Sequence, residues 1–103
     1  MARKRPVFWT GPALDDLRAI RAYVSRDKPE AAKRLGRRLE ESVLVLRDHP
    51  EIGRRVLEFP ATGYREVVVA PYRVIYEVGE DRIVVLRVWH SSRSSESLEE
   101  ELG

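Results

Sequence analysis

The chain has 103 residues, which suits one compact domain, because so few residues cannot bury a second core. Hydrophobic residues make up 43% and charged residues 35%, a balance that favours a folded chain over a disordered one. No apolar run approaches the roughly 18–20 residues of a membrane span, and no signal-peptide core follows the basic N-terminal residues. We therefore expect a cytoplasmic protein with no membrane partner.

Cysteine is absent, which excludes disulfides, thiolate metal sites and cysteine nucleophiles. Only His49 and His90 remain as imidazole ligands, and they do not match a zinc motif, so we expect neither a metal nor a cofactor. The formal net charge of +2 hides an asymmetry, because residues 91–103 carry −3 and residues 1–90 carry +5. A basic body favours contact with a polyanion or an acidic protein segment, and charge alone does not decide between them.

The first half of the chain predicts a short strand followed by two helices. The apolar run 7–9 predicts the strand. Apolar residues spaced by three and four predict an amphipathic helix over 12–26, namely Leu14, Leu17, Ile20 and Val24. A second helix is expected to begin at 27–30, with the Asp27 carboxylate as its cap, and to continue until Pro50 stops it. Two helices joined this closely lie as an antiparallel hairpin.

The second half predicts a β-meander. Residues 51–63 are interpreted as a loop with a short extended stretch at 56–59, and strands are expected at 64–70, 72–78 and 83–90. The last two strands are apolar on both faces, so helices should cover one face and something else, such as a partner, the other. The predicted fold class is α+β, with the N-terminal helical hairpin packed on a small antiparallel β-sheet.

The C-terminal segment differs in composition from the rest of the chain. Residues 94–103 are rich in serine and glutamate and are interpreted as an acidic tail outside a single domain of residues 1–93. The tail is expected to be either mobile or a weak terminal helix.

Arg73 and His90 are the first candidates for chemistry, and their relation depends on strand register. A two-residue turn between the last two strands places Arg73 opposite Val88, so that His90 lies on the same face about 7–8 Å away. A three-residue turn places the two on opposite faces, and the sequence leaves both open. A guanidinium and an imidazole together can hold a phosphate and move a proton. The alternative is a solvated strand arginine and a strand-end histidine bonded to the backbone.

Other basic and aromatic residues extend this candidate surface. Arginine binds phosphate and aromatic rings stack on bases, although aromatic residues in a small sheet more often pack in the core. The additional candidates are the basic Arg65 and the binding residues Arg87, Arg93, Tyr76 and Trp89.

Several short segments, in order, resemble one family of small proteins. Residues 63–66, 72–76 and 83–90, with Arg93, resemble the C-terminal half of the RelE/ParE superfamily of toxins. The patterns Asp16-Leu17-x-x-Ile20-x-x-Tyr23, Pro29-x-x-Ala32 and Pro50-x-x-Gly53-Arg54 resemble the helical hairpin and the following loop of its ParE branch. The resemblance covers about residues 7–93 and agrees with the order of elements predicted above.

This resemblance implies the toxin of a type II toxin–antitoxin system, held silent in a hetero-oligomer by an antitoxin that wraps it as a helix or an added strand. Toxins of the RelE and YoeB branches cleave mRNA on the ribosome. In that pattern Arg73 matches a catalytic arginine, His90 the catalytic histidine of the YoeB version, and Arg65 a basic residue of the RelE version. Toxins of the ParE branch instead bind and poison DNA gyrase.

The tail departs from the nuclease pattern, because no tyrosine follows the last strand and Ser97 stands nearby instead. This departure and the hairpin patterns favour a ParE-like gyrase poison. A ribosome-dependent mRNA endonuclease and a non-toxic binding module that keeps the fold remain as alternatives.

Overall fold

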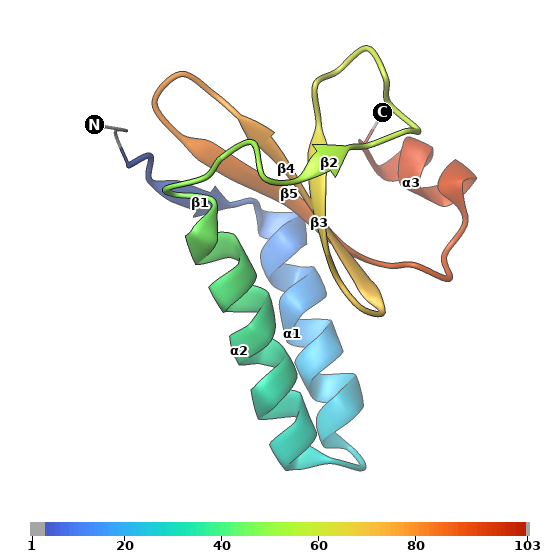
Figure 1. Ribbon diagram of the computed structural model, residues 1–103. Helices are drawn as coiled ribbons and strands as arrows, with labels where there is room; N and C mark the ends of the chain where they lie inside the picture. The colour runs from blue at the N-terminus through green and yellow to red at the C-terminus, as the bar shows by residue number, and fades with distance from the viewer. Residues whose placement is uncertain (1–3, 103) are drawn as a thin grey trace.

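The computed structural model describes residues 4–102 and contains three helices and one five-stranded sheet (Figure 1). In chain order the elements are β1 (Val7–Trp9), α1 (Gly11–Ser25), α2 (Pro29–Val45), β2 (Arg54–Arg55), β3 (Arg65–Val69), β4 (Tyr72–Val78), β5 (Ile83–His90) and α3 (Ser95–Leu102). Figure 1 shows α1 and α2 side by side on one face of the sheet, with their connection extending well beyond it, and α3 on the other face. The predicted α+β class and helical hairpin are confirmed.

Both hairpin helices lie where their apolar spacing predicts, with differences at their ends. The side chain of Thr10 caps α1 by accepting a hydrogen bond from the backbone N–H of Ala13 at 3.1 Å. At α2 the predicted cap is wrong, because Lys28 occupies the N-cap position and makes no side-chain hydrogen bond there. Helix α2 also ends at Val45, before Pro50, since the next residue, Leu46, turns in to pack against β4 and β5. No helix within residues 4–102 has the length and apolar character needed to cross a membrane.

The sheet has the order β1-β5-β4-β3-β2. The predicted antiparallel meander is present in β3, β4 and β5, and the parallel pairing of β1 makes the sheet mixed, which the prediction of an antiparallel sheet did not include. Strand β1 is the edge strand nearest the N-terminus (Figure 1), and it pairs in parallel with β5. The extended stretch predicted at 56–59 lies at Arg54–Arg55 instead, because Val56 turns inward and becomes fully buried. The hydrophobic pattern of such short strands does not predict which strand they pair with, or whether the pairing is parallel or antiparallel.

A β-bulge sets the register of the central β4–β5 pair. Near the turn, Tyr76 pairs with Val85, whereas further along Ile75 pairs with Arg87, so that β5 contains one extra residue, Leu86. A bulge shifts the alternation of side chains by one, so residues beyond it exchange faces relative to an unbroken ladder. The register beyond the bulge therefore cannot be obtained from the length of the turn.

Each face of the sheet has its own apolar cluster. On the hairpin face, residues from α1 and α2 pack against β3, β4 and β5 and include Ala13, Leu17, Leu39, Val43, Val69, Val74, Val85 and Val88. On the opposite face, here called the α3 face, Leu98 of α3 packs with Val56, Ile75 and Trp89. The expectation that something outside the hairpin covers this second face is thus met in part by the chain's own C-terminal segment. Of the two possibilities left open for that segment, the structure shows a terminal helix.

Candidate functional site

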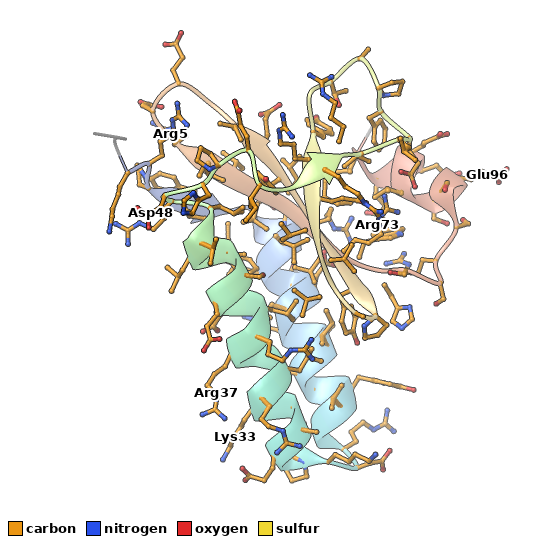
Figure 2. All side chains as sticks on the ribbon, in the orientation of Figure 1. Arg5, Lys33, Arg37, Asp48, Arg73 and Glu96 are labelled. Atoms are coloured by element: carbon orange, nitrogen blue, oxygen red, sulfur yellow. The ribbon has the colours of Figure 1, made fainter. Side chains whose placement is uncertain are left out.

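Arg73 is the centre of a charged cluster on the α3 face. Its side chain rises from the second residue of β4, is 13% exposed, and lies between the sheet and α3 (Figure 2). Its Nε donates to Glu66 on β3 at 2.7 Å, and its two terminal nitrogens donate to the two carboxylate oxygens of Glu58 at 3.0 and 2.8 Å. The Arg73 guanidinium is therefore bound by two carboxylates, one of them in a bidentate arrangement.

Two further polar contacts complete the cluster. The hydroxyl of Ser95, at the start of α3, donates to Glu58 at 3.0 Å, and Nε of Arg54 donates to Glu66 at 2.7 Å. The cluster lines a hollow of about 510 Å³ formed by Arg54, Leu57, Glu58, Glu66, Arg73, Ser91 and Ser95. Two arginines face two glutamates there, so the hollow has no excess of positive charge to attract a phosphate.

The pKa values of this pair favour the charged forms. The hydrogen bond from Arg73 lowers the pKa of Glu58 from 4.5 to about 2, against the opposing effect of burial. The hydrogen bond to Glu58 in turn raises the pKa of Arg73 above its usual value. Both groups are therefore ionised at neutral pH, and no physiological change of pH releases Arg73 from Glu58.

This pair makes stability depend on pH in a defined direction. Because folding lowers the pKa of Glu58, its stabilising contribution is complete above pH 4.5 and is lost as pH falls through about 2. We expect Glu58→Gln to lower the free energy of unfolding by about 2–3 kcal/mol at neutral pH, with the gap to wild type closing as pH approaches 2. Urea unfolding across this pH range measures the gap. Glu41→Gln, at an exposed residue of α2, is the control and should change little; a gap for Glu58→Gln that stays constant with pH would contradict the assignment.

His90 lies at the end of β5 and points to the hairpin face. Its ring meets Tyr72 edge to face at 5.2 Å, and its Nδ1 accepts a hydrogen bond from the backbone N–H of Ser92 at 3.1 Å. That contact leaves the proton of the neutral ring on Nε2. In the register, Tyr72 pairs with His90 and Arg73 pairs with Trp89, so Arg73 and His90 lie on opposite faces. The same-face arrangement considered from the sequence does not occur, because the bulge at Leu86 shifts the alternation.

The other candidate arginines are mostly occupied by structural contacts. Arg65 donates to the carbonyl of Gly53 at 2.7 Å and so holds the segment before β2. Arg87 is 9% exposed and bonds to Asp16 of α1 and Glu101 of α3; the hydrogen bond to Asp16 is the main cause of its raised pKa. Arg93 lies over the Trp89 ring at 3.7 Å and is exposed. Within residues 4–102 it is the one arginine of these three whose guanidinium has no hydrogen-bonded partner.

The two aromatic candidates, Tyr76 and Trp89, are fully buried. The Tyr76 hydroxyl donates to the carbonyl of Pro50 at 2.8 Å and accepts from the N–H of Gly53 at 2.9 Å, so it ties the loop after α2 to the sheet. Trp89 is enclosed by Leu98 and the other residues of the α3-face cluster. Neither ring offers a face on which a base of a nucleic acid can stack.

Sequence reasoning missed the carboxylates that bind these arginines. Glu66 is an acidic residue within a run of valines in β3, and a buried carboxylate in such a strand requires a cationic partner. The position of Glu66 in a valine-rich strand could therefore have predicted its pairing with an arginine. No feature of the loop sequence predicts the pairing of Glu58. Within residues 4–102 there is also no group of three or more histidine, aspartate or glutamate residues placed to hold a metal ion.

Comparison with known sequences assigns the family. A model of the family described as the ParE toxin of the type II toxin-antitoxin system parDE matches residues 7–95. The chain is also 39% identical over 87 residues to Toxin RelE2 of Caulobacter vibrioides, an alignment that covers 84% of this chain and 96% of that protein. The chain therefore belongs to the ParE toxin family of type II toxin–antitoxin systems, and its resemblance to RelE/ParE toxins is confirmed.

Solved structures share the fold. A chain of the chromosomal ParDE system from P. aeruginosa superposes with a TM-score of 0.74 at 23% identity, covering 86% of this chain and 98% of that one. A chain of the toxin–antitoxin complex RelBE2 from Mycobacterium tuberculosis superposes with a TM-score of 0.60 at 20% identity, covering 87% and 94%. At these identities the likeness concerns the fold alone.

Proposed function

We propose that this chain is a ParE-like toxin that inhibits growth by binding and poisoning DNA gyrase. The observation that carries the proposal is the double ion pair of Arg73 with Glu58 and Glu66. A ribonuclease of the RelE or YoeB kind needs this arginine free to stabilise charge on a phosphate, and here two carboxylates already neutralise it. His90 faces the other side of the sheet, and the tail has no tyrosine. A toxin that acts by binding needs no such acid–base set.

Gyrase inhibition is tested with purified components. The chain is added to DNA gyrase, ATP and relaxed plasmid, and the topoisomers are separated on a gel. We expect supercoiling to stop, and the His90→Ala variant to inhibit as strongly as wild type, because His90 takes no part in a binding mechanism. Unimpaired supercoiling at a large excess of toxin would remove gyrase as the target.

We further propose that a cognate antitoxin neutralises the chain in the cytoplasm, where both candidate targets act. Both structural relatives described above come from toxin–antitoxin systems, one of them a complex. The base of the hairpin also exposes apolar side chains suited to a protein partner, including Leu14, Leu44 and Val45. Leu14 and Leu44 line a hollow of about 320 Å³ between β1, α1 and α2. A partner segment that buries this surface would form the hetero-oligomer.

The second candidate is a ribosome-dependent mRNA endonuclease, favoured by the 39% identity to a toxin named RelE2. In this case the ribosome would have to draw Arg73 away from Glu58 and Glu66. Cleavage of mRNA on programmed ribosomes by wild type, Arg73→Ala and His90→Ala tests the roles. Circular dichroism verifies the fold of both variants. Loss of mRNA cleavage in both would support this candidate, whereas equal cleavage by all three chains would show that Arg73 and His90 do not have the assigned roles. Harmless induction in a host without an antitoxin would instead favour a non-toxic module.

A further inference from the structure

The positive charge of this protein is concentrated on the part of the helical hairpin that extends beyond the sheet. Residues 18–38, here called the arm, contain eight basic and two acidic residues, a formal net charge of +6 against +2 for the whole chain. The remainder of the chain is therefore net acidic. Figure 2 shows Lys33 and Arg37 on α2, near the end of the hairpin that is remote from the sheet.

Most of the cations of the arm are exposed and unpaired. Three form ion pairs, Arg18 with Asp15, Arg21 with Glu40 and Lys33 with Glu30. Within residues 4–102 the other five form none, and each is exposed: Arg26, Lys28, Arg34, Arg37 and Arg38. The arginines of the sheet differ, because the partly buried Arg73 and the buried Arg87 are both bound by carboxylates.

Helix geometry gathers three of these arginines on one surface. Arg34, Arg37 and Arg38 are related by steps of three and four residues, so they lie together on α2. The buried residues of α2, which include Ala32, Gly36 and Leu39, lie on the other side of the helix. Like charges at this spacing repel each other, and an anionic ligand would relieve that repulsion. Positions 34–38 span about 6 Å along α2, so the three arginines form a short, dense cationic face on the outer side of the helix.

An ion pair between the two helices lies beside this face. An ideal Cβ at Gly36 would lie 2.5 Å from Nε of Arg21, so the glycine leaves room for the Arg21 side chain to cross from α1 to its ion pair with Glu40 on α2. Beside this crossing a hollow of about 570 Å³ opens between the helices, and Arg21, Lys33 and Arg37 contribute to its lining.

The composition of the arm favours a nucleic acid over a protein. Tyr23 is the one large hydrophobic residue in the arm that is substantially exposed, whereas the base of the hairpin exposes several. Protein interfaces are centred on apolar and aromatic side chains, and single-stranded nucleic acid is bound by stacking on aromatic rings. Contact with the phosphates of a duplex requires cations alone.

We propose that the arm binds the phosphate backbone of duplex DNA, with the outer face of α2 placed along the major groove. A helix is about 10–12 Å wide and the major groove of B-form DNA is about 12 Å wide, while the major groove of an RNA duplex is too narrow to admit it. This contact with DNA does not require gyrase. It therefore goes beyond the proposed target and is tested independently of it.

Fluorescence anisotropy of a short labelled DNA duplex tests the proposal with the full chain. The arm variant is Arg34→Gln, Arg37→Gln and Arg38→Gln, and glutamine preserves helix propensity. The matched control is Arg47→Gln, Arg55→Gln and Arg82→Gln, which removes the same charge from exposed positions near the sheet. Circular dichroism verifies both folds.

We expect the arm variant to bind the duplex at least about tenfold more weakly than wild type at 0.1 M salt, and the control to stay within about twofold. The slope of log affinity against log salt should fall by about 2–3 in the arm variant, since each lost phosphate contact removes about 0.9. Equal weakening by the two variants, or no binding by wild type at low salt, would overturn the proposal. Equal or tighter binding to an RNA duplex or a single strand would overturn the assignment to duplex DNA.

Discussion

Replacing Asp16 by alanine is expected to lower the free energy of unfolding by about 3–5 kcal/mol. The Asp16 carboxylate accepts hydrogen bonds from Nε and a terminal nitrogen of Arg87 at 2.7 and 2.8 Å, and from the backbone N–H of Val88 at 2.9 Å. Without it, a buried guanidinium keeps only the bond to Glu101, and a backbone donor in β5 loses its partner. Urea unfolding followed by tryptophan fluorescence measures the loss.

The neighbouring Asp15 supplies a control of the same chemistry. Its ion pair with Arg18 lies at the surface, where both side chains are more than 70% exposed, so Asp15→Ala should change the free energy by at most about 0.5 kcal/mol. Equal effects of the two substitutions would show that Asp16 does not join α1 to β5 as described.

Truncating Leu98 is expected to have the second large effect. Leu98 is fully buried between α3 and the sheet, in contact with the cluster that contains Ile75 and Trp89. Leu98→Ala should lower the free energy of unfolding by about 2–4 kcal/mol and speed hydrogen exchange of the α3 amides. Leu57→Ala, at a leucine that is 87% exposed, is the matched control and should be nearly neutral. Identical stabilities for the two variants would mean that residues 94–102 do not pack on the sheet in solution.

The helices and their order could be predicted because each signal is local. Leu17 and Ile20 mark the packed side of α1, where Ala13 rather than the exposed Leu14 is buried, and Pro29 in the first turn marks the start of α2. The three strands of the meander also follow from composition. Their faces could not be predicted, because one extra residue at Leu86 decides which face Arg73 and His90 occupy. A bulge among consecutive valines and leucines has no sequence signature.

The contacts of the candidate site depend on residues far apart in the chain. Asp16 and Arg87 are separated by 71 positions, and in the sequence Asp16 reads as an ordinary acidic residue near a helix N-terminus. The tail was equally hard to interpret, since Leu98 and Leu102 are its only apolar residues and their spacing of four is a weak helical signal. Charge counting assigned the positive charge to residues 1–90 as a whole, and the candidate arginines were placed on the sheet, because sequence does not show which arginines are already paired.

Labelling of macromolecular synthesis after induction tests the central claim most directly. Cells that lack the antitoxin are given labelled precursors of DNA, RNA and protein at short intervals after the toxin gene is switched on. We expect DNA synthesis to fall first while protein synthesis continues, because the proposed function of a chain whose Arg73 is bound by Glu58 and Glu66 is to bind and poison gyrase. An immediate arrest of protein synthesis, with DNA synthesis continuing, would contradict that claim and point to the ribosome.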